Sequence, residues 1–223
     1  MRAVPSFRIA RHADDPHDSE EFRYPFAGAE NPKVRLGVVS TAAGAGQEAR
    51  WFDLTGPFGE DFYLARVDWT PAGAILAQVQ SRDQRDLTIL RLDPETGAAT
   101  RLMTERNEAW INLHDILRPL KAGGFLWASE QDGWRHLWVH GDDGSAARRL
   151  TSGEWLVEEL VKLDEDHGFA YFMGSAAGHL QRHLYRVALD GARRRSEKLL
   201  APSTRPARAA GCGLPKGISR QVC

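Results

Sequence analysis

The sequence predicts an all-β fold, a partial β-propeller of about three to four four-stranded antiparallel blades. Three observations predict it. The run Trp110–Trp155 reads as four short strands separated by turns. Apolar and polar residues alternate in LTILRL and AILAQV, which is the two-residue period of a sheet with two different faces. Finally, the same strand and turn pattern recurs along the chain at a fixed interval.

Three segments of the chain can be laid over one another. Each has a strand ending in Ser, a polar turn, a strand that carries Leu87, Leu137 or Leu184, an acidic-Gly turn and a closing Leu. The closing residues Leu102, Leu150 and Leu199 are about 48 residues apart, within the range of four-stranded propeller blades. A β-sandwich meander is the alternative, but a sandwich has no reason to repeat its turn chemistry at a fixed period.

The elements follow in order. Residues 1–33 are expected to be extended or looped, because Pro25 and Pro32 disfavour helix before them. Residues 34–200 form the partial propeller, and its first two strands are expected at Val34–Ser40 and Glu48–Leu54. A four-stranded unit follows over about Phe62–Met103.

The run Trp110–Trp155 is the second four-stranded unit. We expect a strand led by Trp110, one after Gly123-Gly124, one from Trp134 and one ending near Leu150. Another unit begins at Leu156. Residues 201–223 contain three prolines and no alternation, so we expect a disordered tail or a sequence that has lost its reading frame, and we favour the second hypothesis.

Bulk composition excludes several classes of protein. The 29 basic and 30 acidic residues give a net charge of −1, so the basic excess typical of nucleic-acid binding is absent. No apolar run approaches the roughly 20 residues that span a bilayer, and the N-terminus does not read as a secretory signal. Both cysteines, Cys212 and Cys223, lie near the C-terminus, so no disulfide framework is expected and a cytoplasmic location is the default.

Few residues suggest chemistry, and each has a simpler interpretation. Glu20-Glu21 could bind an ammonium group, but a solvated acidic loop is favoured. His114-Asp115 could pair as a base and its orienting carboxylate. Neighbouring strand residues point to opposite faces, however, so a local turn or an inter-blade hydrogen bond is favoured for them.

The remaining histidines and arginines are also expected to be structural. His179 and His183 have a spacing that would suit a metal on a helix, yet Gly178 and HLYRVAL argue against a helix. Arg135-His136 and Arg182-His183 occupy equivalent places in two repeats, as architectural pairs do. Arg193–Arg195 is expected to be an exposed turn. No nucleophile elbow, P-loop, dinucleotide fingerprint or C-x-x-C is present, so we predict no catalytic, substrate-binding or metal-binding residue and no cofactor.

Several phrases resemble the propeller domain of the dipeptidyl peptidase IV family, which are serine peptidases of the prolyl oligopeptidase clan. They occur in the expected order over about residues 20–200. They are FRYPFAGAENPKV, ARVDWTPAG, WINLHD, SEQDGWRHLW, LTSGEW, and YFMGS followed by RHLYRV.

This resemblance implies an enzyme that removes N-terminal dipeptides whose second residue is proline or alanine. In that family an eight-bladed propeller covers an α/β-hydrolase domain that supplies Ser, Asp and His. A glutamate pair on the propeller holds the substrate amine, and an arginine contacts a substrate carbonyl. Both would precede Met1 here, and Glu20-Glu21 does not align with the pair. The hydrolase domain would follow residue 223.

Two functions are therefore carried forward. The first is the non-catalytic propeller portion of such a peptidase, inactive alone, which walls and gates the active-site cavity and meets peptide substrate through a hydrolase domain outside this chain. The resemblance leaves a homodimer open for the parent protein, and neither a nucleic acid nor a membrane is expected as a partner. The alternative is a stand-alone propeller-like binding module, whose unpaired strand edges would invite aggregation.

Overall fold

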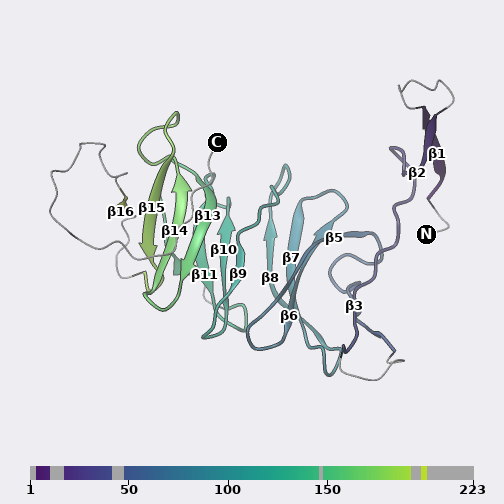
Figure 1. Ribbon diagram of the computed structural model, residues 1–223, viewed down its shortest axis with the longest axis horizontal. Coiled ribbons are helices and arrows are strands. Elements are labelled where there is room, and N and C mark those ends of the chain that lie inside the picture. The colour runs from purple at the N-terminus through teal and green to yellow at the C-terminus, as the bar shows by residue number, and fades with distance from the viewer. Residues whose placement is uncertain (1–3, 11–17, 42–47, 146–147, 192–196, 200–223) are drawn as a thin grey trace.

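A computed structural model of the chain describes residues 4–10, 18–41, 48–145, 148–191 and 197–199. All regular structure in these residues is β, and it includes three four-stranded antiparallel sheets that stand one after another along the chain (Figure 1). Within each sheet the strands follow chain order. This meander confirms the predicted all-β fold, a partial propeller of four-stranded blades.

The first blade has a buried centre. Its second strand is buried at every residue, and its third at all but its first residue and Arg91, because neighbouring layers cover both faces. A tight turn at Gly73, with φ of 86°, joins the first two strands. The blade consists of β5 (Phe62–Trp69), β6 (Ile75–Ser81), β7 (Asp86–Leu92) and β8 (Ala99–Arg106).

The second blade departs from the sequence prediction at its start. Residues 107–116 form an irregular connection, so the expected strand led by Trp110 is wrong, and the first strand begins at Leu117. Backbone groups in this connection bond across the chain instead; the Ile111 N–H, for example, donates to the Gln84 carbonyl oxygen at 2.8 Å. The blade consists of β9 (Leu117–Pro119), β10 (Phe125–Ser129), β11 (His136–His140) and β12 (Arg148–Arg149).

The third blade repeats the closing contact of the second. The Leu150 N–H donates to the carbonyl oxygen of Leu137, and the Leu199 N–H donates to that of Leu184, both at 2.8 Å. The repeated leucines of these two segments therefore hold equivalent places. The third blade consists of β13 (Val157–Asp164), β14 (Phe169–Gly174), β15 (His183–Ala188) and β16 (Glu197–Lys198).

Two hairpins precede the blades. The strands β1 (Ser6–Ala10) and β2 (Ser19–Arg23) pair with each other and stand away from the blades in Figure 1. The segment expected to be extended or looped therefore contains a strand pair. The strands β3 (Gly37–Val38) and β4 (Arg50–Trp51) are shorter than expected, and residues around them pack on the first blade.

Two hydrophobic layers join the three blades. We call the layer between the first and second blades the first junction, and that between the second and third the second junction. The first contains Leu76, Leu87, Ile89, Leu102, Ile111, Leu117, Phe125 and Trp127. The second contains Ile116, Leu126, Ala128, Leu137, Leu150, Val157, Ala170, Phe172, Tyr185 and Val187.

The repeated serines tie each blade to its connections. Ser81, Ser129 and Ser175 are all buried where the second strand of their blade ends. The hydroxyl oxygen of each accepts one backbone N–H that the strand ladder leaves unpaired, which removes the cost of burying it. The donors are Asp86 N at 3.0 Å for Ser81, Gln131 N at 3.1 Å for Ser129 and Leu156 N at 3.1 Å for Ser175.

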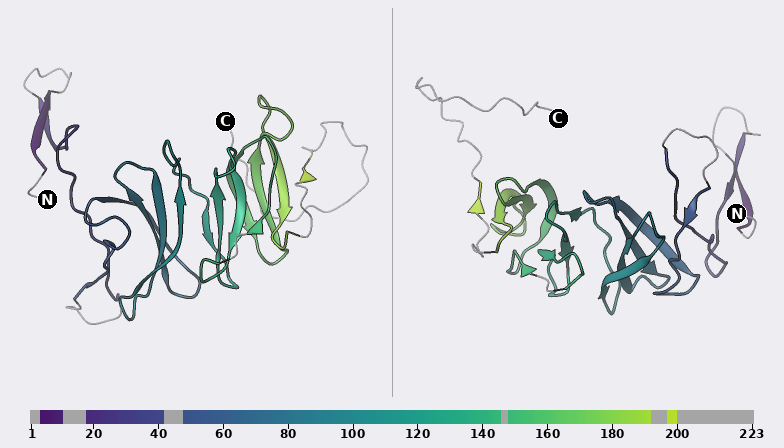
Figure 2. Two further views of the ribbon diagram at one scale, coloured as in Figure 1. Left: turned by 180° about the vertical axis from the view of Figure 1, so that it is seen from behind. Right: turned by 90° about the horizontal axis from the view of Figure 1, so that it is seen from below.

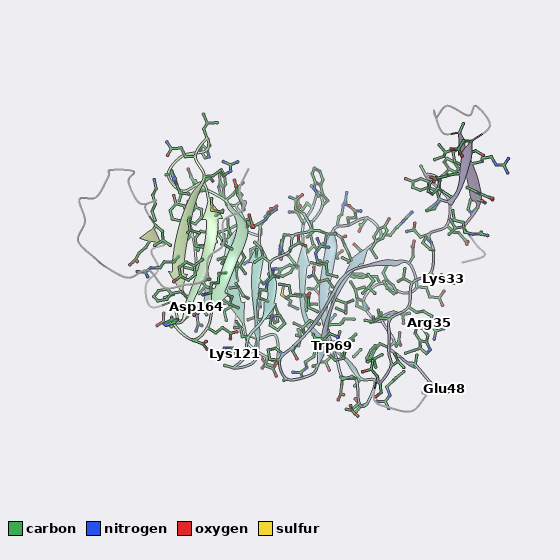
Figure 3. All side chains as sticks on the ribbon, in the orientation of Figure 1. Lys33, Arg35, Glu48, Trp69, Lys121 and Asp164 are labelled. Atoms are coloured by element: carbon green, nitrogen blue, oxygen red, sulfur yellow. The ribbon has the colours of Figure 1, made fainter. Side chains whose placement is uncertain are left out.

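The meander gives the blades two different ends. At one end, the hairpin end, short turns join the first strand of a blade to its second. Trp69, Lys121 and Asp164 mark this end along the lower edge of Figure 3, and Figure 2 shows the same blades from behind and from below. At the other, the connection end, lie the longer segments that include residues 107–116, 150–156 and 175–182.

Some predictions fall outside the described residues, namely those for Arg193–Arg195 and for the tail 201–223. Within the residues that are described, no helix is long and apolar enough to cross a membrane.

Candidate functional site

The candidate site lies at the connection end of the first junction. It is built on residues 107–116, which lead from β8 to β9, and it includes the His114-Asp115 pair singled out in the sequence. Because this segment has no ladder partner, its backbone and side chains bond to residues of both neighbouring blades. The connection is therefore held at several points along its length.

His114 is a half-buried, neutral imidazole, and both of its ring nitrogens are hydrogen-bonded. Nε2 lies 2.6 Å from the Ala128 carbonyl oxygen, to which it donates, and Nδ1 accepts the Ile116 N–H at 3.1 Å. Burial lowers the pKa of His114 from 6.5 to about 4. A second proton would have to sit on Nδ1, where it would face the Ile116 N–H. His114 therefore positions the connection and has no free nitrogen for base catalysis.

Asp115 faces the preceding blade. One of its carboxylate oxygens lies 2.7 Å from a guanidinium nitrogen of Arg66 on β5, and the Arg66 Nε also donates to the His114 carbonyl oxygen at 3.3 Å. The side chains of His114 and Asp115 thus bond to different blades and not to each other. These are the local and inter-blade contacts that the structural interpretation of the pair predicts.

A polar chain runs from this connection into the second blade. The Trp110 Nε1 donates to Asn112 at 3.0 Å, and Asn112 donates to a Glu130 oxygen at 2.7 Å. Arg135 donates to the other Glu130 oxygen at 2.6 Å, in a partly buried ion pair. The space enclosed between this chain and His114 is about 10 Å³, enough for one water molecule at most. No substrate fits within it.

Glu105 is the residue that sequence reasoning missed. It sits on β8, and its carboxylate accepts Trp127 Nε1–H at 2.8 Å and the Ser129 hydroxyl at 3.0 Å, both from the second blade. Burial raises the pKa of Glu105 above its ordinary value. The segment RLMTER carries no motif. Glu105 lies opposite Leu87, the place that Leu150 and Leu199 hold in the other blades, but the sequence prediction gave that place to Leu102.

The other sequence candidates are dispersed. Glu20 and Glu21 lie on strand β2 and not in a loop, and Glu21 bonds to Ser6. His179 stacks on Trp134 at 5.8 Å, and His183 bonds to Gln181 at 3.0 Å. The described residues contain no group of three or more His, Cys, Asp or Glu side chains that could hold a metal ion.

In the two repeated Arg-His pairs both arginines form ion pairs, but the two histidines differ in burial and in hydrogen bonding. Arg135 pairs with Glu130, and Arg182 pairs with Glu158. His136 is fully buried and bonds to Thr151 at 3.0 Å and to the Gly153 carbonyl oxygen at 2.9 Å, whereas His183 is half-buried. Each arginine thus forms an ion pair within its own blade, which is an architectural role.

Comparison with known proteins identifies the family these blades resemble. Residues 1–207 match the family described as the dipeptidyl peptidase IV (DPP IV) N-terminal region. The crystal structure of Porphyromonas gingivalis dipeptidyl peptidase 4 is similar, with a TM-score of 0.77 and 25% sequence identity. The likeness covers 88% of this chain and 27% of that one.

Curated relatives give the same result. The protein named "Probable dipeptidyl peptidase 4" from Aspergillus clavatus is 26% identical over 203 residues, which are 83% of this chain and 26% of the relative. Dipeptidyl peptidase 4 from Arthroderma otae is 27% identical over 177 residues, or 76% of this chain and 22% of the relative. The chain therefore spans about a quarter of the length of the curated relatives it matches.

Proposed function

Because the chain belongs to the dipeptidyl peptidase IV N-terminal region family, we propose that it is the non-catalytic propeller portion of a dipeptidyl peptidase IV-like serine peptidase. Its role is to wall and gate the active-site cavity of an α/β-hydrolase domain that removes N-terminal X-Pro or X-Ala dipeptides. The family match over residues 1–207, together with three consecutive propeller sheets, carries this proposal. The activity itself belongs to the complete enzyme.

The connection end is the face that meets the catalytic domain in this proposal. Large apolar side chains are exposed on its connections, and they are Trp110 at 59%, Leu113 at 43% and Leu180 at 99%. Apolar side chains exposed this far favour burial against another surface. The connection that carries Trp110 and Leu113 is also fixed by His114 and Asp115, so it presents those side chains on a firm support.

The isolated chain is expected to hydrolyse no dipeptide substrate. A nucleophile, its base and oxyanion donors supply most of the rate enhancement of a serine peptidase, on the order of 10⁶-fold or more. His114 is neutral and both of its ring nitrogens are hydrogen-bonded, so it supplies none of these groups. The test is an assay of the purified chain with an Ala-Pro or Gly-Pro chromogenic substrate. Release of the chromophore above background would contradict the proposal.

The gating role has its own test in the complete enzyme. Leu180→Ser removes the most exposed apolar side chain of the connection end, and Val161→Ser removes one that is exposed on β13 and serves as the control. We expect Leu180→Ser to change kcat/KM for long peptides relative to dipeptide-length substrates, while Val161→Ser leaves that ratio unchanged. An unchanged ratio in Leu180→Ser would refute the gating role and leave the family assignment intact.

A stand-alone binding module remains the second candidate. The observation in its favour is that both junctions are filled by side chains from within the chain, so the three blades can hold together without a further domain. A soluble monomer with one cooperative thermal transition would favour the module. Aggregation, or association into a larger closed assembly, would favour the peptidase portion.

A further inference from the structure

A small cavity of about 130 Å³ lies within the first junction, apart from the His114 connection. Strand β8 forms one wall and the β10–β11 pair forms the other. Its volume equals that of about four water molecules, at roughly 30 Å³ each, so it suits a ligand of about four non-hydrogen atoms. The lining residues that matter here are Glu105, Trp127, Trp138 and His140.

Two polar atoms that line this cavity have no partner. His140 is 9% exposed, and its Nδ1 makes no hydrogen bond, while its ring stacks on Phe125 at 4.9 Å. The Nε1 of Trp138 is buried and likewise unbonded. A buried donor or acceptor without a partner costs roughly 1–3 kcal/mol, so native proteins rarely leave one without water or a ligand.

Two charged side chains line the cavity, Glu105 and Arg106, and the Arg106 Nε lies 3.8 Å from a carboxylate oxygen of Asp86. Glu105 accepts hydrogen bonds from Trp127 and Ser129, yet no ion pair of Glu105 occurs in the part of the chain that the structure describes. The Glu130 backbone N–H contributes a further hydrogen bond to this carboxylate. A carboxylate can accept about four hydrogen bonds, so one place remains open. Burial lowers the pKa of His140, which keeps its imidazole neutral and leaves it without a positive charge to offset the carboxylate.

We propose that this cavity binds a small primary ammonium compound that carries a neighbouring oxygen atom, of the amino-alcohol class. The ammonium group donates to Glu105 and to His140 Nδ1, and the ligand oxygen accepts the Trp138 Nε1–H. The indoles of Trp127 and Trp138 supply aromatic walls, against which an organic cation is attracted. The ligand thus satisfies both unpartnered atoms and gives the Glu105 carboxylate an ion-pair partner.

The probe is ethanolamine, titrated into the full chain labelled with ¹⁵N. The indole N–H signals are assigned by Trp138→Phe and Trp127→Phe, and the signal of the exposed Trp69 is the internal control. For so small a ligand we expect a Kd on the order of 1 mM. The Trp127 and Trp138 signals should shift and saturate while the Trp69 signal stays in place.

Two comparisons make the test specific. Neutral ethylene glycol should leave all the indole signals unmoved, because it lacks the charge. Glu105→Gln should weaken ethanolamine binding at least about tenfold, whereas Glu108→Gln, an exposed acid three residues away, should not. If Glu105→Gln fails to fold, the ethylene glycol comparison on the unaltered chain decides.

Three outcomes would overturn the proposal. They are the absence of any shift up to about 100 mM ethanolamine, a hundredfold above the expected Kd, equal shifts with ethylene glycol, or unchanged affinity in folded Glu105→Gln. Each would mean that the cavity holds water only. None of them bears on the peptidase assignment, because that rests on the family match and on the hydrolysis assay.

Discussion

The two junctions both pack one blade against the next, but different kinds of side chain fill them. The second is filled by aliphatic and aromatic side chains, and Trp155 closes it by stacking on Phe172 and Tyr185 at about 6 Å. The first has a hydrophobic layer too, but Gln78, Gln80 and His140 are buried beside it and Glu105 crosses it. Consecutive blades of one repeat therefore need not share one kind of interface.

The difference shows what each junction is suited to do. An apolar layer gains stability in proportion to the area it buries and has no preferred partner within that area. A buried hydrogen bond such as Trp127 to Glu105 fixes the position of one blade on the next, since leaving either group unpaired is costly. The first junction, which carries the His114 connection and the cavity, therefore holds its blades in one defined position.

The largest effect is expected from truncating the centre of the second junction. Phe172→Ala removes a fully buried ring that packs on Trp155 and Tyr185, and we expect it to lower the free energy of unfolding by about 4 kcal/mol. Phe125→Ala in the first junction is the matched variant. It should cost about 1 kcal/mol less, because the space it leaves adjoins a polar cavity that water can enter. Urea unfolding of both variants measures the difference, and equal costs would contradict the contrast between the junctions.

The next effect concerns the close approach of the first two blades. Gly144 has φ of 79°, and a Cβ there would lie 2.0 Å from the Leu102 carbonyl oxygen on β8. Gly144→Ala should therefore lower the free energy of unfolding by about 3 kcal/mol. Gly73→Ala is the control, because Gly73 has φ of 86° but nothing within 4 Å of its Cβ position. It should cost only about 1 kcal/mol, for the backbone conformation alone. Similar losses in the two variants would mean that the blades can separate at Gly144 without penalty.

The sequence predicted the repeat well in the second and third blades, but in the first blade the residue opposite Leu87 is Glu105 and not the expected Leu102. Leu150 and Leu199 make the same closing hydrogen bond, and Ser81, Ser129 and Ser175 are buried at equivalent strand ends. A fixed period of strands and turns is a local property, so it is visible in the residues themselves. The prediction was wrong at Trp110, where an aromatic residue in an irregular connection was taken for the start of a strand.

The candidate site was harder to predict because its contacts are not local. Glu105 meets Trp127 and Ser129 across a junction, and Asp115 meets Arg66 on the preceding blade. Neither pairing leaves a spacing rule in the chain. His114 makes the kind of local and inter-blade hydrogen bond that was expected, yet its partners Ala128 and Ile116 could be identified only once β10 was placed beside the connection.

Mild acid should act first on the connection at His114. Its pKa in the folded chain is about 4 against an ordinary 6.5, so below pH 6.5 the unfolded chain binds a proton that the folded chain does not. Stability is therefore full above pH 6.5 and falls as the pH drops toward 4, by up to about 3 kcal/mol. Arg66 and Arg135 nearby favour the neutral ring, and Glu130 opposes them. Burial lowers the pKa of His136 and of His140 in the same direction.

Thermal unfolding between pH 7 and pH 4.5 tests this expectation. His114→Asn removes the titrating group and should flatten the pH dependence, whereas His179→Gln, at an exposed histidine, should leave the slope as it is. If the thermal stability of His114→Asn falls with pH as steeply as that of the unaltered chain, other groups cause the acid sensitivity.

The smallest effect is expected at Glu105, and its sign is opposite to that of His114. Burial raises the pKa of Glu105 in the folded chain, so the folded state binds the proton first and this group adds stability as the pH falls through that raised value. Glu105→Gln keeps an oxygen that can accept the Trp127 N–H, so at pH 7 we expect a change within about 1 kcal/mol. As the pH falls toward 4.5, the variant should lose stability more steeply than the unaltered chain, because the opposing contribution is gone. Parallel melting curves of the two proteins from pH 7 to pH 4.5 would show instead that Glu105 is solvated, and the polar character assigned to the first junction would then rest on its glutamines and His140 alone.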